Sequence, residues 1–301
     1  MPLAFRFLGV PFLQGPGPAV AAIHLCPARV HLGVVREGGG LELYNRLELA
    51  ALDLEDAGQG RNLRFRPTIN NSITEVALLG PEGAPVLSRW DLGNGCRLPS
   101  LPFQGASVLE YSLDGRFLAA GGEGGLLQVW HLGGEAATTV LRLECGSRVE
   151  ALCFHPEHPT LYALLEGGVP AAFELAPGHA ASVPLVLVEQ APGVGFTHLA
   201  AGPGSYALHL AGDDGQVYVV DTVTGDVGAF HPEVGPILGL EVLPSSGCLC
   251  VRGRRSVYLA PPRLAVRGEH LALRCPFACP TYAAWELGRD ALLVFHAAEA
   301  P

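Results

Sequence analysis

An internal repeat is the feature that most constrains how this chain can fold. Each copy has an apolar run that alternates with polar residues, a turn, a second apolar run, a turn rich in Gly and acidic residues, and a third run. The third runs end at Tyr44, Trp90, Trp130, Phe173, Val220 and Tyr258. These end positions are 46, 40, 43, 47 and 38 residues apart, so the period is about 43 residues.

This period predicts the fold. A repeat of about 40–45 residues built from several short strands is typical of a β-propeller. Helical repeats would place apolar residues three and four apart, whereas these runs alternate by two. The 39 Gly and 25 Pro residues would also interrupt helices. Seven such units fill the 301 residues, so we predict an all-β, seven-bladed β-propeller with residues 1–301 as one domain.

The two ends of the chain together predict how the ring closes. The seventh unit has only two apolar runs, within residues 280–287 and 291–296. The run Leu3–Leu8 looks like a strand but belongs to no unit of its own. We therefore expect residues 3–13 to complete the last blade together with residues 280–296. Such a closure would remove the open edges that an unclosed ring exposes.

The third unit carries a family resemblance. Its residues Ser112–Gly122 read SLDGRFLAAGG, and Gln128–Leu132 read QVWHL. This pattern resembles the WD-repeat family, and Arg89–Leu92 and Val219–Asp221 carry a similar ending. The resemblance implies a propeller that binds other proteins. The Gly-His pair that opens such repeats occurs only at Gly178-His179 and is absent from the other units. A buried network of His, Asp, Ser and Trp is therefore not expected.

The turns between the second and third runs form one candidate site. Five of them are acidic, at Glu37, Glu82, Glu123, Glu166 and Asp213–Asp214. One interpretation is an acidic face for a basic peptide or a cation. The other is turn chemistry, in which Gly and Asp supply positive φ angles and Glu is merely solvated. The second interpretation is favoured, and the first is kept as a hypothesis.

The sixth unit breaks the acidic pattern. Its equivalent turn carries Arg252, Arg254 and Arg255. Because guanidinium groups form paired hydrogen bonds with carboxylates, these residues could hold an anionic group of a partner. The favoured interpretation is a solvated loop that balances its acidic neighbours. We treat them, with the acidic turns, as the hypothetical partner-binding residues.

The remaining chemistry excludes several classes of function. The 11 His residues form no His-Glu-x-x-His helix, and no phosphate-binding loop, dinucleotide fingerprint or nucleophile elbow is present. The 8 Cys residues lack the pair spacing of a zinc site, so we expect mostly free, buried thiols and no metal or cofactor. A net charge of -10 argues against nucleic-acid binding. With neither a secretory signal nor a membrane segment identified, we expect a cytoplasmic protein.

Two functions of different classes remain. The favoured one is a non-catalytic scaffold, a monomeric propeller that mediates protein–protein interaction within a larger complex. The alternative is a propeller enzyme, a lactonase-like hydrolase or a lyase, with a metal on the channel axis. That enzyme needs inward-pointing carboxylates or imidazoles. The inner runs offer Glu110, Glu150, Glu241, His24 and His198.

Overall fold

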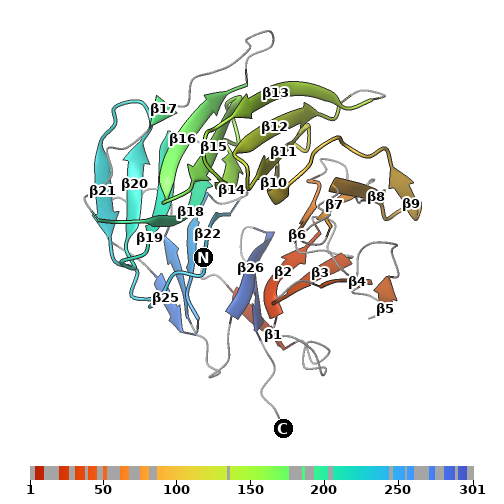
Figure 1. Ribbon diagram of the computed structural model, residues 1–301. Coiled ribbons are helices and arrows are strands. Elements are labelled where there is room, and N and C mark those ends of the chain that lie inside the picture. Colours follow the sequence, from red (N-terminus) through yellow and green to blue (C-terminus); the bar gives the residue numbers. More distant parts are fainter. Residues whose placement is uncertain are drawn as a thin grey trace.

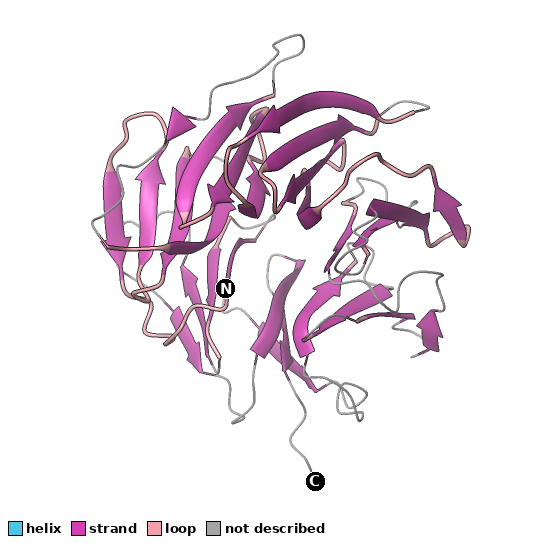
Figure 2. Cartoon of the chain, in the orientation of Figure 1, coloured by secondary structure: helices cyan, strands magenta, loops and turns pink. Residues whose placement is uncertain are grey.

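The computed structural model places strands throughout the chain. It describes residues 4–9, 20–26, 31–37, 40–45, 50–52, 62–67, 75–80, 87–133, 136–175, 185–186, 193–202, 206–243, 247–254, 256–260, 271–274, 281–288 and 291–296. Every regular element in these ranges is a β-strand (Figure 2). None of the described segments is a helix long and apolar enough to cross a membrane. The fold class is therefore all-β, as predicted.

The strands form sheets that follow one another along the chain. Sheet 1 contains β2 (Val20–Leu25), β3 (His31–Arg36), β4 (Leu41–Asn45) and β5 (Ala50–Leu52). Sheet 2 contains β6 (Asn62–Phe65), β7 (Glu75–Leu79), β8 (Leu87–Asp91) and β9 (Cys96–Leu98). Sheet 3 contains β10 (Ala106–Tyr111), β11 (Phe117–Gly122), β12 (Leu126–His131) and β13 (Thr138–Glu144).

The same antiparallel order continues in the second half. Sheet 4 contains β14 (Val149–Phe154), β15 (Thr160–Leu165), β16 (Val169–Glu174) and β17 (Leu185–Val186). Sheet 5 contains β18 (Phe196–Ala201), β19 (Ala207–Gly212), β20 (Val217–Asp221) and β21 (Val227–Phe230). Sheet 6 contains β22 (Gly239–Val242), β23 (Leu249–Arg252), β24 (Ser256–Ala260) and β25 (Leu271–Arg274). Figure 1 shows the sheets arranged around a central space, with the first strand of each sheet innermost.

The last sheet joins the two ends of the chain. Sheet 7 contains β26 (Thr281–Gly288), β27 (Ala291–His296) and β1 (Ala4–Gly9). β26 and β27 are antiparallel, whereas β1 lies parallel to β27, with Ala4 opposite Ala291 and Gly9 opposite His296. The segment expected to meet residues 280–296 therefore includes a strand that pairs with them.

Burial changes in a regular way from the inside of a sheet to its outside. The inner strand β10 alternates between buried and part-exposed residues, because one edge faces the central space. The second strand β11 is almost wholly buried, since neighbouring sheets cover both of its faces. The outer strand β13 is mostly exposed. The outer strands thus lack an apolar signal, which is why only three runs per unit are visible in the sequence.

The hydrophobic core lies between successive sheets rather than within one of them. Trp130, only 1% exposed, packs in a cluster with Leu79 and Leu87 of sheet 2 and Leu109 of sheet 3. Trp90 lies in the corresponding cluster between sheets 1 and 2. Both indoles therefore pack between neighbouring repeats. Their indole nitrogens have no hydrogen-bond partner among the described atoms.

The cysteines are less uniformly buried than expected. The six within the described ranges are free thiols. Cys26 and Cys250 are buried, Cys96 is exposed, and the others are half-buried. Burial raises the pKa of the Cys153 thiol to about 12, with a further contribution from Glu110. Cys275 and Cys279 lie outside the described residues.

Candidate functional site

The acidic turns occupy one repeated position in the sheets. In each of these sheets the last residue of the second strand pairs with the first residue of the innermost strand. The acidic residue is the next one along the chain. Those starting pairs are Val20 with Arg36, Ala106 with Gly122, Val149 with Leu165, and Phe196 with Gly212. The register therefore makes Glu37, Glu123, Glu166 and Asp213 equivalent, and all four are exposed. Glu82 lies outside the described residues.

A recurring backbone hydrogen bond fixes these turns. The amide of the acidic residue donates to a carbonyl just before the innermost strand of the same sheet. The bonds are Glu123 N to Gly105 O (3.1 Å), Glu166 N to Arg148 O (2.8 Å) and Asp213 N to Gly195 O (2.9 Å). The turns also contain glycines with positive φ, such as Gly125 at 82° and Gly215 at 79°. Turn chemistry thus accounts for the glycines, and the fold places the exposed carboxylates beside the starts of the inner strands.

Asp214 has a different role from its neighbour Asp213. Its Oδ2 accepts hydrogen bonds from the Tyr218 hydroxyl (2.7 Å) and Gln216 Nε2 (2.8 Å), and its Oδ1 accepts from Gln216 N (3.0 Å). These donors lower the pKa of Asp214 despite an opposing effect of burial. Asp214 therefore stabilises its own turn.

The arginines of the sixth unit are divided between the turn and the channel. When the pairs Leu240–Val251 of sheet 6 and Ile23–Val34 of sheet 1 are aligned, the register places Arg254 at the position of the acidic residues. Arg252 Nη2 donates to Leu238 O (3.1 Å), and the guanidinium lies across Gly239. Arg252 lines the central cavity, whereas Arg254 is exposed on the turn. Arg255 lies outside the described residues.

The central cavity has a volume of about 650 Å³, and its lining residues among the described side chains belong to sheets 1–6. Its described polar lining includes the residues expected from the inner runs, namely His24, Glu110, Glu150, His198 and Glu241. It also includes Asn62 and Arg64, which the sequence interpretation missed, and Arg252, which that interpretation assigned to the turn. Arg64 and Asn62 belong to β6. Because these two residues are polar, β6 does not stand out in the sequence as an apolar run.

Arg64 organises one side of this cavity. Its Nε donates to Glu110 Oε2 at 3.0 Å, across the boundary between sheets 2 and 3. Its Nη1 donates to Leu63 O (3.0 Å) and Asn62 Oδ1 (3.3 Å) and lies 3.2 Å from His24 Nε2 in sheet 1. One guanidinium therefore connects the inner strands of three successive sheets.

The cavity changes the pKa values of its titratable groups. Burial lowers the pKa of His24 well below its usual range, and the charges of Arg64 and Arg252 lower it further. Burial and then Arg252 lower the pKa of His198. Burial raises the pKa of Glu241, although the two arginines oppose that shift. Near neutral pH both imidazoles are therefore uncharged. Among the described residues, no three His, Cys, Asp or Glu side chains are grouped to hold a metal ion.

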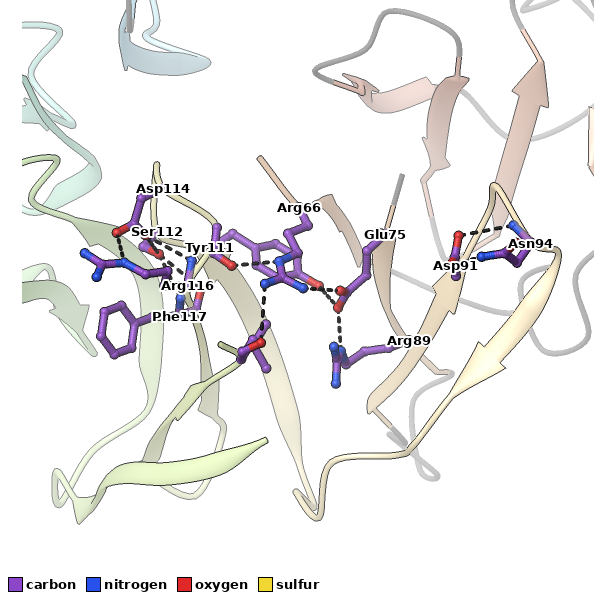
Figure 3. Close-up of polar contacts among 12 residues, drawn as sticks. Arg66, Glu75, Arg89, Asp91, Asn94, Tyr111, Ser112, Asp114, Arg116 and Phe117 are labelled. Carbon is purple, nitrogen blue, oxygen red and sulfur yellow. Dashed lines mark hydrogen bonds and ion pairs between the residues drawn. The ribbon is translucent and has the colours of Figure 1, made fainter. Parts of the chain in front are cut away.

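A second polar cluster joins sheets 2 and 3 (Figure 3). Glu75, 1% exposed, accepts hydrogen bonds through Oε1 from Arg89 Nε (2.5 Å) and the Tyr111 hydroxyl (2.9 Å). Its Oε2 accepts from Arg66 Nη1 (2.8 Å). Burial alone would raise the pKa of Glu75, but the hydrogen bonds and charges of Arg89 and Arg66 lower it. The cluster lies in the core, so its role is to hold the two sheets together.

The WD-like turn of sheet 3 docks on the same cluster. Arg66 Nε donates to Gly115 O at 2.7 Å. Ser112 Oγ donates to Asp114 Oδ1 (2.6 Å), and Asp114 Oδ1 accepts from Arg116 N (3.0 Å). Gly115 has a φ of 67°, and a Cβ there would lie 2.0 Å from Pro67 O. The Ser-x-Asp-Gly motif thus builds a turn tight enough to approach sheet 2.

Comparison with known proteins addresses the fold. No protein-family model and no curated protein matches the sequence. Solved structures do match, among them the crystal structure of the β-propeller domain of Cps50 (Swd1) from Myceliophteria thermophila. The TM-score is 0.61 at 13% identity, over 80% of this chain and 82% of that chain. The chain therefore has the β-propeller fold that its WD-like repeats predict.

Proposed function

We propose that this protein is a non-catalytic scaffold that binds a protein partner through the end of the propeller that carries the turns between second and third strands. In this proposal residues 1–301 form one seven-bladed domain, closed by β1 against β27, that acts in the cytoplasm as one subunit of a complex. The observation that carries the proposal is the equivalent, exposed placement of Glu37, Glu123, Glu166 and Asp213.

The charge pattern supports a partner of defined chemistry. Four equivalent carboxylates offer an acidic surface, and the exposed Arg254 adds a basic point beside it. A partner surface that is basic apart from one acidic group would complement both the four carboxylates and Arg254. Such a match favours one docking orientation. Short turns on packed sheets also hold these charges in fixed positions, so little order is lost on binding.

The enzyme alternative has one observation in its favour. Glu110, Glu150, Glu241, His24 and His198 do line the central cavity. A metal assay on the purified protein separates the two functions. Stoichiometric Ca²⁺ or Zn²⁺ would favour a lactonase-like hydrolase or a lyase, and metal-free protein that still binds its partner supports the scaffold.

Charge reversal at Arg254 tests the binding face. We expect Arg254→Glu to leave the melting temperature unchanged, because exposed turn charges contribute little to stability. We expect it to weaken binding of the co-purifying partner by about tenfold at low salt and to alter the salt dependence of association. The measurement is affinity purification from the native organism, followed by a titration of the identified partner.

A matched reversal provides the control. Arg142 is exposed on the outer strand β13, away from the turns. Arg142→Glu should leave partner binding unchanged. If both reversals have equal effects on affinity, the turn that carries Arg254 is not part of the binding surface.

A further inference from the structure

The central cavity contains a second feature that scaffold binding does not use. Its polar lining combines two guanidinium groups, Arg64 and Arg252, with Glu110, Glu150 and Glu241. Ligand pockets commonly have volumes of about 300–1,000 Å³, and this cavity of about 650 Å³ falls within that range. Glu150, which lines this space, is exposed, so the wall of the cavity at this point is solvated rather than packed shut.

Arg64 is held in a fixed orientation. Glu110 fixes its Nε, and Leu63 O, Asn62 Oδ1 and His24 surround its Nη1. Its Nη2 has no hydrogen-bond partner among the described residues. A guanidinium that is already oriented loses little freedom when it binds an anion.

Arg252 supplies the second positive charge. Its guanidinium lies across Gly239 at the start of the inner strand β22. Arg64 Nη1 lies 3.2 Å from His24 Nε2, whereas the Arg252 guanidinium lies at Gly239, two residues before Glu241 on the same strand. Both guanidinium groups therefore line the same cavity, one beside His24 and the other near Glu241.

We infer that the central cavity binds a carboxylate group between Arg64 and Arg252. The planar fork of arginine matches a carboxylate, and a cation would meet two positive charges in the same region. A phosphate dianion would be repelled more strongly than a carboxylate by Glu110 and Glu150.

The carboxylate could belong to a small dicarboxylic acid or to an acidic side chain of a peptide. Both sources are tested by NMR titration of the full chain, following its arginine Nε–H resonances. The probes are glutarate and the blocked peptide acetyl-Gly-Glu-Gly-amide. Glutaramide, which has the same shape without the charges, is the control ligand, and inorganic phosphate and agmatine test the phosphate and cation alternatives.

We expect saturable binding of glutarate or the peptide and none of glutaramide. Tighter binding of glutarate identifies a small acid, and tighter binding of the peptide identifies a protein segment. Arg64→Gln or Arg252→Gln should each weaken the binding by at least about tenfold, because each removes charged hydrogen bonds. Arg254→Gln, on the exposed turn, should change it less than about twofold.

Three results would overturn the inference. These are equal binding of glutaramide, tighter binding of phosphate or agmatine, and no saturation by either carboxylate probe below about 10 mM. Equal affinity in Arg252→Gln and Arg254→Gln would also contradict it, and this comparison holds even if Arg64→Gln does not fold. The partner-binding face is tested separately, so its failure would leave this site standing.

Discussion

Replacing Glu75 with glutamine is expected to lower the free energy of unfolding by about 3–5 kcal/mol at neutral pH. Glu75 is buried and accepts hydrogen bonds from Arg66, Arg89 and Tyr111, which belong to two different sheets. The amide removes the negative charge and leaves the buried guanidinium of Arg89 without compensation. The melting temperature should fall by roughly 5–10 °C, which differential scanning calorimetry measures.

The pH dependence of this effect distinguishes an ionised Glu75 from a merely well-packed one. Its pKa in the folded state lies below the ordinary value of 4.5. The stability that the carboxylate provides is therefore complete above about pH 4.5 and is lost as the pH falls through the lowered pKa. The difference between wild type and Glu75→Gln should shrink under acid conditions.

Glu123→Gln is the matched control for Glu75→Gln. Glu123 is an exposed turn residue, so the same substitution there should change stability by less than about 0.5 kcal/mol. A melting temperature for Glu75→Gln that stays within the range of this control would contradict the proposed role of the cluster in joining sheets 2 and 3.

Deleting residues 2–9, which removes β1, is expected to cause the second large loss. β1 pairs with β27 along six residues, from Ala4 with Ala291 to Gly9 with His296. Without it, β27 presents an unpaired edge, and several hydrogen bonds of about 1 kcal/mol each are lost. We expect a lower melting temperature or concentration-dependent aggregation, measured by calorimetry and light scattering.

Deletion of residues 2–3 alone is the control for the loss of β1, because both residues precede that strand. It should be neutral. A protein without residues 2–9 that remains monomeric and melts at the wild-type temperature would show that β1 does not support the propeller.

The inner and second strands could be predicted from the sequence because their burial produces a pattern. The alternating residues Gly-Leu-Glu-Val at 239–242 form β22, and the apolar run at 160–165 forms β15. β6 was not identified, because Asn62 and Arg64 interrupt its apolar residues. Asn62 and Arg64 line the cavity. The polar side chains that hide β6 in the sequence are therefore the same ones that make it part of the candidate site.

The candidate site includes contacts that residue type and spacing alone cannot predict. The acidic turns could be read from their recurring Glu-Gly and Asp-Gly pairs. The convergence of Arg64 with Glu110 and His24 could not, because these residues are 46 and 40 positions apart and meet only when sheets 1, 2 and 3 surround one space. Likewise, Arg252 belongs to an arginine-rich turn in the sequence, but the fold places it in the lining of the cavity.

Cross-linking of β1 to β27 tests most directly the central proposal that the chain forms one closed propeller. Ala4 lies opposite Ala291, whereas Ala284 lies on β26, one strand further from β1. In the double variant Ala4→Cys with Ala291→Cys, dibromobimane should form an intramolecular cross-link, detected by mass spectrometry of the monomer. The variant Ala4→Cys with Ala284→Cys should not form it, because a second strand spacing of about 4.8 Å is added. Equal cross-linking in both variants, or none in the first, would contradict closure of the ring through β1.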